Sequence, residues 1–172
     1  MIRYEDISAA IQVRHLQVRL DEAVVLTPTD SADQAAAKLA PHGFDQAPVL
    51  DEGRVVGLFN VADVPTGNPL VGDSVRPIRP EYLVSADAPV SRVLAWLIEA
   101  PCLFVLDGRQ ITGFIVEADL NKQPARTYFY LLVASLEAGL AGLIREWMHG
   151  DEFVLLPVLS EAMRSRVLEM RA

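Results

Sequence analysis

The sequence predicts an α+β fold in which two β-α-β-β-α repeats pack about a pseudo-twofold axis, followed by a C-terminal helical hairpin. Two observations predict the repeats. The stretches GLFNVADV (57–64) and GFIVEADL (113–120) share one pattern, a Gly, then apolar positions, then an Asp six residues after the Gly, and the patterns that precede them recur at offsets of 56 to 58 residues. A third observation, a long apolar pattern of helical period after residue 123, predicts the hairpin.

Each repeat opens with a short strand that contains β-branched residues, followed by an amphipathic helix. The expected strands are 24–27 and 82–85, and the polar turns TPTDS and SADAPV that follow them carry residues typical of a helix start. Apolar residues then recur at helical spacing, at positions 32, 35, 36 and 39 and at positions 90, 93, 94 and 97. This period predicts a helix with one buried face in each repeat.

Each repeat continues with a β-hairpin and a second helix. The expected strand pairs are 47–50 with 55–59 and 103–106 with 111–116, joined by the turns DEGR and DGRQ. The second helices should begin near Val61 and near Ala118. One such unit is too small to cover its own sheet, so we expect the two repeats to pack sheet against sheet.

The chain therefore divides into a first repeat (11–64), a linker that leads into the second repeat (65–80), the second repeat (71–122) and a C-terminal helical region (123–172). The linker holds four of the eleven prolines, which is typical of a locally stiff connection rather than a third domain.

This ordered set of motifs, present twice, resembles a tandem pair of CBS domains, the regulatory unit also called a Bateman module. The turns, the hairpins APVLDEGRVVG and LFVLDGRQITG, and the two Gly-to-Asp junctions carry the resemblance over residues 11–122. It implies a non-enzymatic regulatory protein that senses an adenine-nucleotide-type ligand between the repeats. Ligand binding would be transmitted to the attached helices or to the geometry of a dimer.

The resemblance assigns the two junction acids to ribose. In this family the Asp carboxylate accepts hydrogen bonds from both ribose hydroxyls, which suits an ionised group that only accepts. Carried over, it makes Asp63 and Asp119 the ribose-binding residues. The alternative reading of the same two residues is that they are helix N-caps, because each lies where a helix is expected to begin.

The resemblance also suggests the residues around the base and the phosphate. Thr27 and Ser85, in the polar turns, would lie beside the base. The family places a Ser or Thr three residues before the Asp, where it reaches a phosphate. Here that position holds Asn60, which can still hydrogen-bond a ligand, and Val116, which cannot. Lys122 follows the second Asp and could project toward a phosphate.

The charge and composition of the chain limit the classes of ligand and partner that we expect it to bind. The net charge is −8, and the excess lies in residues 1–120, which have nine basic and seventeen acidic side chains. Such a surface repels a nucleic acid, whereas a small phosphate ligand needs only one or two arginines and some backbone N–H groups. The start MIRYEDIS lacks the pattern of a signal peptide, and the single cysteine, Cys102, lies in an apolar stretch, so we expect a cytoplasmic protein with a buried thiol. No metal-ligand spacing is present.

The C-terminal region is expected to contain a helix that starts at Pro124 and ends at Gly150. Its apolar stretch, 128–144, is shorter than a comfortable membrane span and includes Glu137, so we expect no membrane contact. We expect instead a helix buried between partners, with a second helix at about 156–170 folding back on it, and hence a homodimer.

Two other functions remain open from the sequence. The repeats could be a pair without a ligand that serves as a dimerisation scaffold, which Val116 favours. The C-terminal part could be a helical ribonuclease of the HEPN type, because Arg145 and His149 share a helix face, although three residues separate them where the pattern has four to six. No other catalytic motif is found, and we expect no enzyme.

Overall fold

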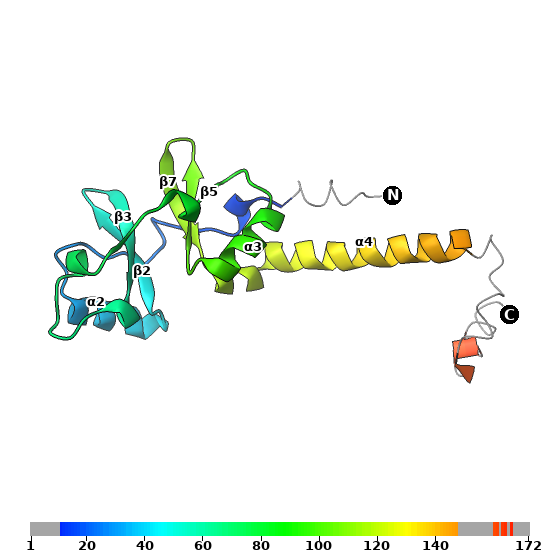
Figure 1. Cartoon of the computed structure of the whole chain (residues 1–172), viewed down its shortest axis with the longest axis horizontal. Coiled ribbons are helices and arrows are strands. Elements are labelled where there is room, and N and C mark those ends of the chain that lie inside the picture. Colours follow the sequence, from blue (N-terminus) through cyan, green and yellow to red (C-terminus); the bar gives the residue numbers. More distant parts are fainter. Residues whose placement is uncertain (1–10, 148–159, 162, 165, 167–172) are drawn as a thin grey trace.

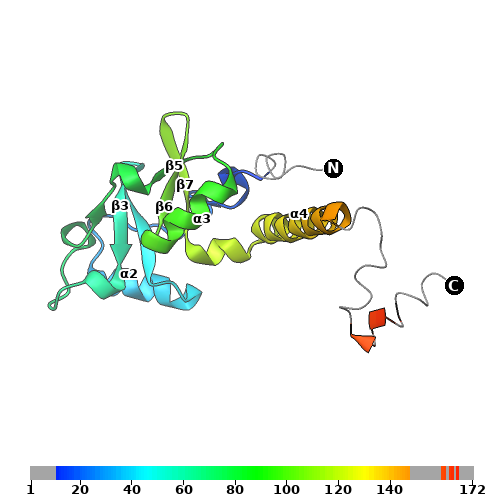
Figure 2. The same ribbon diagram turned by 45° about the vertical axis from the view of Figure 1, so that its right-hand side comes forward.

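The computed structural model describes residues 11–147 together with Ser160, Glu161, Met163, Arg164 and Arg166. Two small α+β units lie side by side, and one long helix, α4 (Gln123–Trp147), leaves the second unit and extends away from the body (Figure 1). A second view shows the same separation between the two units and the projecting helix (Figure 2).

The first repeat contains a three-stranded sheet in the order β2-β3-β4, in which all neighbours are antiparallel. Its elements are α2 (Ala32–Leu39), β2 (Gln46–Asp51), β3 (Arg54–Asn60) and β4 (Arg76–Pro77). The second repeat contains a four-stranded sheet in the order β1-β7-β6-β5, in which only β5 and β6 are parallel. Its elements are β1 (Val18–Arg19), β5 (Leu83–Ser85), α3 (Val90–Glu99), β6 (Leu103–Asp107) and β7 (Gln110–Ile115).

Short 3-10 helices connect these elements: η1 (Val13–His15), η2 (Ala40–His42), η3 (Val61–Asp63), η4 (Val71–Asp73), η5 (Pro80–Tyr82) and η6 (Glu117–Asn121). The expected hairpins and first helices are confirmed, with strand ends that differ by one residue at most. The first strand of repeat one is reduced to a single parallel bridge between Leu26 and Val49.

The expected second helices near Val61 and Ala118 are wrong as α-helices, because both segments are 3-10 turns. Pro65 explains the first case, since a residue before proline avoids the helical region, and Val64 is indeed extended with φ −71° and ψ 120°. In the second case Lys122 is extended (φ −65°, ψ 153°) and separates η6 from the long helix α4.

Local sequence explains how the two first helices are placed. Ser31 caps α2 in a reciprocal box, because its hydroxyl accepts from the Gln34 N–H while the Gln34 side chain accepts from the Ser31 N–H at 3.0 Å. Each helix then turns one apolar face to its sheet. The buried residues are Ala32, Ala35 and Leu39 in α2, and Val90, Val93 and Leu97 in α3.

The flanking segments are exchanged between the repeats. Val13 and Leu16, at the start of the first repeat, are fully buried in the core of the second, and β1 pairs with β7. Val71, in the linker, is fully buried in the core of the first repeat, and β4 pairs with β3. The 65–80 segment is therefore part of the first repeat's packing as well as a connection. The two repeats interlock, because each core is completed by chain that lies outside its own hairpin and helix.

The two sheets also pack against each other, as expected. Leu58 from the first sheet and Cys102 and Phe104 from the second form a buried cluster, extended by partly buried apolar side chains of both repeats. The Gln46 side-chain nitrogen crosses this contact and donates to the Pro101 carbonyl at 3.3 Å.

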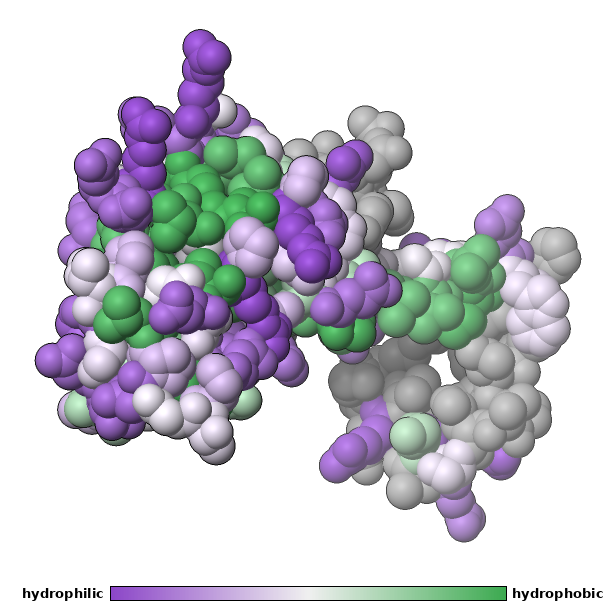
Figure 3. Space-filling view, turned by 60° about the vertical axis from the view of Figure 1, so that its left-hand side comes forward, coloured by the Kyte–Doolittle hydropathy of each residue, from purple (hydrophilic) through white to green (hydrophobic). Residues whose placement is uncertain are grey.

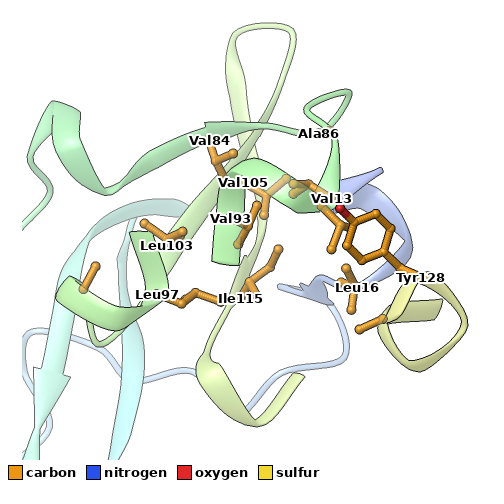
Figure 4. Packing of buried hydrophobic residues seen from close by; sticks show 13 residues of the cluster. Val13, Leu16, Val84, Ala86, Val93, Leu97, Leu103, Val105, Ile115 and Tyr128 are labelled. Carbon is orange, nitrogen blue, oxygen red and sulfur yellow. The ribbon is translucent and has the colours of Figure 1, made fainter. Parts of the chain in front are cut away.

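The long helix begins inside the second repeat and leaves it after two turns. Ala125 and Tyr128 are buried there, and Figure 4 shows the Tyr128 ring directed at Val13 and Leu16. A start at Pro124 is confirmed to within one residue. The expected end at Gly150 and most of the expected 156–170 helix lie outside the described residues. Within the described chain, α4 is not buried between other elements beyond its first turns.

Candidate functional site

The first Gly-to-Asp junction ends in an ion pair. Asp63, at the end of η3, faces Arg76 of β4, and both guanidinium contacts reach the carboxylate: Nη2 lies 2.5 Å from Oδ1 and Nε pairs with Oδ2. This hydrogen bond to Asp63 raises the pKa of Arg76 above its usual value. The Asp63 side chain keeps 29% of its surface exposed, so a ligand can approach it. The junction thus presents a carboxylate and a guanidinium together.

Asn60 lies at the start of the same junction. Its side-chain oxygen accepts a hydrogen bond from the Ala62 N–H at 2.8 Å and caps η3. The amide nitrogen of this side chain remains a donor for a ligand. In the first repeat, therefore, the carboxylate is held by an arginine and the N-cap is Asn60 rather than Asp63.

In the second junction the Asp119 carboxylate is bonded to other groups of the same chain. Asp119 is 5% exposed, and its Oδ2 accepts from the Val116 N–H at 2.8 Å, as the third residue of a helix does when it reaches back to the N-cap in a capping box. Its Oδ1 lies 2.9 Å from the Lys122 Nζ, and that nitrogen also donates to the Leu16 carbonyl at 2.8 Å. The structure thus places Asp119 and Lys122 in a structural contact that ties η6 to the N-terminal segment.

The two junctions also differ at the strand opposite them. Leu58 of β3 pairs with Arg76, and in the second repeat Phe114 of β7 pairs with Val18. Val18 therefore holds the place of Arg76 and offers no charge. Sequence reasoning missed Arg76, because only the pairing of β4 with β3 brings a linker residue to the junction.

The polar turns lie at the other end of each sheet. Thr27 follows the Leu26–Val49 bridge, whereas Asn60 pairs with Gln46, about four residues and roughly 13 Å away along β2. In the second repeat Ser85 pairs with Leu106. Within one repeat the structure therefore does not bring the Thr or Ser turn to the Gly-to-Asp junction. A single ligand that uses both features must combine residues from the two repeats.

Both turn residues have local partners. The Thr27 N–H donates to the Asp30 carboxylate at 2.9 Å, and its hydroxyl lies 3.2 Å from the Thr29 hydroxyl. The Ser85 hydroxyl accepts from the Asp87 N–H at 3.3 Å. These bonds shape the turns that lead into α2 and α3, so a role in ligand binding stays a prediction for both residues.

Arg76 lies next to the second repeat. It lines a small hollow of about 20 Å³ between the two sheets, together with Leu58, Pro77, Tyr82, Pro101, Cys102 and Phe104. A hollow of this size holds about one water molecule, so a nucleotide base would have to open it. Tyr82 also lines a larger surface groove of about 520 Å³, where Glu81 and Glu99 disfavour a phosphate.

Comparison with known proteins agrees with this geometry. The family model of the CBS domain matches residues 13–64. The crystal structure of the CBS-pair protein CBSX2 from Arabidopsis thaliana is similar over 70% of this chain and 96% of that one, with 18% identity and a TM-score of 0.58. The chain has the fold of a CBS-domain pair, and residues 13–64 match the CBS domain itself.

Two further solved structures share the fold of this CBS pair. CBSX2 in complex with AMP matches 64% of this chain and 93% of that one, at 20% identity and a TM-score of 0.56. The CBS domain of a bacterial CNNM/CorC family Mg²⁺ transporter in complex with ATP matches 68% and 89%, at 17% identity and a TM-score of 0.58. No curated protein matches the sequence.

The metal, ribonuclease and cysteine readings of the sequence concern residues outside the two junctions. No group of three or more His, Cys, Asp and Glu side chains that could hold a metal occurs among them. Arg145 is exposed near the end of α4, and its proposed ribonuclease partner His149 lies outside the described residues. Cys102 is buried, and this burial raises the pKa of its thiol to about 12, so it is not a reactive nucleophile at neutral pH.

Proposed function

We propose that this protein is a regulatory CBS pair that binds an adenine-nucleotide-type ligand at the first Gly-to-Asp junction, and that it acts as a homodimer. The observation that carries the proposal is the Asp63–Arg76 pair at the contact between the repeats. An acceptor for ribose hydroxyls and a cation for phosphate lie there in one place. Two proteins of the same fold were solved with AMP and with ATP.

Different residues of this junction bind different parts of the ligand. The Asp63 carboxylate accepts from the ribose hydroxyls, and Arg76 and the Asn60 amide nitrogen turn to the phosphate. The base enters between the sheets beside Tyr82, by widening the apolar hollow that Leu58 and Phe104 line. Binding therefore has to exchange the Asp63–Arg76 contact for contacts with the ligand. The second junction takes no part, since its carboxylate is already occupied within the chain.

Ligand binding is transmitted through the interlocked segments. Arg76 belongs to β4, and opening the hollow at Tyr82 moves η5 and β5 against β6. The second repeat holds the first turns of α4 through Ala125 and Tyr128. A ligand that favours one arrangement of the sheets therefore also shifts the direction of α4, because α4 is fixed to the sheet that moves.

The test is nucleotide binding by the purified full chain, measured as thermal shift and by calorimetry. AMP, ADP, ATP, cyclic dinucleotides and S-adenosylmethionine are compared, each in excess. A ligand at about one hundred times its dissociation constant adds roughly 2.7 kcal/mol of stability, or several degrees. Asp63→Asn should abolish the shift, whereas Asp51→Asn, at an exposed hairpin position of the same repeat, should retain it.

Arg76→Met separates the role of the phosphate from that of the nucleoside. It should weaken AMP binding about tenfold or more, as expected for the loss of a charge-assisted hydrogen bond, and leave adenosine binding unchanged. Equal losses for AMP and adenosine would contradict the assignment of Arg76 to the phosphate.

The second candidate function is a dimerisation scaffold without a ligand. The buried, internally paired Asp119 and the closed hollow of about 20 Å³ favour it. A stable dimer that shows no shift with any of these nucleotides would establish the scaffold function in place of the sensor.

A further inference from the structure

The long helix α4 carries an exposed apolar face that the described chain does not cover. Beyond Leu132 its large side chains point to solvent: Leu136 is 62% exposed, Leu143 is 64% and Trp147 is 72%. Figure 3 shows hydrophobic side chains gathered on the surface of the helix where it projects from the body. Near the C-terminus the described residues are themselves exposed and leave this face open: Ser160, Glu161, Met163, Arg164 and Arg166.

The spacing of these residues identifies the kind of partner. The large apolar side chains of the face alternate in steps of four and three residues along nearly three heptads. They are Phe129, Val133, Leu136, Leu140, Leu143 and Trp147, called here the α4 seam. A repeat of 3.5 residues is the geometry by which one α-helix packs knobs into the holes of another. The partner of this face is therefore a helix with the same repeat.

The rest of the helix surface is not apolar enough to need a cover. On the face opposite the α4 seam lie Ala134, Ala138, Ala141 and Arg145. By its length and composition, with a mean hydropathy of 1.5, α4 could cross a membrane. Core helices of soluble proteins meet the same criteria. Large apolar side chains on one face only, with Glu137 beside them, favour a helical partner over lipid, which would surround every face.

A second copy of the chain supplies a matching seam. We propose that α4 pairs through this seam with α4 of a second copy, as a parallel two-stranded coiled coil. Such pairing is isologous, because each seam residue meets its own equivalent across the twofold axis. Val133 and Leu140 then occupy a positions and Leu136 and Leu143 d positions. Leucine occupies both of these d positions, and Val133 is β-branched while Leu140 is not; a β-branched residue at a with leucine at d is typical of parallel dimers.

The area of the seam is sufficient for a specific dimer. A fully exposed aromatic side chain contributes about 200 Å² and an aliphatic one about 100 Å². With the measured exposures, the seam and the adjacent Tyr130 and Ile144 offer roughly 600 Å² of apolar surface per helix. Two copies bury about 1,200 Å² together, which reaches the size of specific protein interfaces.

The anchoring of α4 gives this pairing a consequence for the folded body. Tyr128 is buried in the second repeat one residue before the seam begins, and Lys122, directly before the helix, bonds the Leu16 carbonyl at 2.8 Å. A parallel pair therefore holds the two CBS pairs at the same end of the coiled coil. Their distance and rotation are then set by the two seams.

The first experiment is the molar mass of the full chain by light scattering. The wild type should be a dimer and Leu136→Glu a monomer, a halving of the mass, with unchanged circular dichroism of the body because Leu136 is exposed. Ala138→Glu, on the opposite face, is the matched control and should remain dimeric. The inference rests on the homodimer part of the proposed function and not on nucleotide binding. A monomeric wild type overturns both the homodimer and the seam, whereas a dimer that persists in Leu136→Glu overturns the seam alone.

Disulfide cross-linking tests the orientation. Leu136→Cys should form a covalent dimer under mild oxidation, since equivalent d positions face each other only in a parallel pair, and Ala138→Cys should not. The native Cys102 gives no background, because it is buried. A dimer without cross-linking at 136 overturns the parallel arrangement. Co-sedimentation of a monomeric wild type with phosphatidylcholine–phosphatidylglycerol vesicles, lost in Leu136→Glu, would assign the face to a membrane and overturn the proposal.

Discussion

Replacing Gly57 by alanine should push β4 off the first sheet and separate Arg76 from Asp63. A Cβ at Gly57 would lie 2.2 Å from the Arg76 carbonyl oxygen and 2.4 Å from the Val75 Cγ1. Ordinary contacts begin near 3.4 Å, so β4 has to move by about 1 Å. The obstacle is backbone as well as side chain, and a rotamer change cannot relieve it.

The magnitude follows from what β4 contributes. Overpacking of this kind costs about 1–3 kcal/mol, and weakening the short β3–β4 pairing adds about 0.5–1.5 kcal/mol per hydrogen bond lost. We expect a loss of about 2–4 kcal/mol in the free energy of unfolding, which lowers the melting temperature by on the order of 10 °C. Nucleotide binding should weaken as well, because Arg76 moves with the strand.

Chemical denaturation of the full chain measures the effect, with Gly139→Ala as the matched control. A Cβ at Gly139 meets nothing within 4 Å, and alanine in an exposed helix stabilises by up to about 1 kcal/mol relative to glycine. The same chemical change should therefore have opposite signs at the two positions. A Gly57→Ala protein whose free energy of unfolding lies within about 0.5 kcal/mol of the wild type would refute the reasoning, because a change of that size is typical of surface substitutions.

Two further outcomes are expected. Asp119→Ala should lower the free energy of unfolding by about 1–3 kcal/mol, because the hydrogen bond to the Val116 N–H and the contact to Lys122 are lost. Nucleotide affinity should stay unchanged. An unaltered stability with reduced affinity would instead assign Asp119 to the ligand site. Cys102 should resist thiol reagents at pH 8 in the native protein and react after unfolding. Because burial raises the pKa of its thiol from the ordinary 9.0 to about 12, the folded state favours the neutral form, and its contribution to stability is lost as pH rises from 9 to 12. Rapid native labelling would contradict this burial.

Much of the fold could be predicted from local sequence. The two hairpins and the faces of α2 and α3 follow from periodicity and turn chemistry, which act over about a dozen residues. The segments that begin near Val61 and Ala118 were expected to be α-helices, but both are 3-10 turns. Pro65 stops the first after three residues, and the extended Lys122 ends the second.

The candidate site was predicted only in part. Asp63 and Asn60 could be proposed from the repeated junction, and the structure places them together at η3. Thr27 was expected with them, but it lies at the other end of β2, which follows from the parallel bridge between Leu26 and Val49. Arg76 carries no motif, so nothing in the linker sequence indicated that it would meet Asp63.

The sequence by itself determined that one unit occurs twice, where its strands turn, and which helix faces are apolar, because these depend on neighbours along the chain. Only the tertiary structure decided that the repeats exchange their flanking segments, that Asp63 meets an arginine, and that Asp119 is enclosed. Such contacts join residues as far apart as Leu16 and Lys122, and they depend on the order of strands in each sheet. The heptad pattern of α4 is present in the sequence. Only the structure shows that its apolar residues are exposed, because the folded repeats do not cover them.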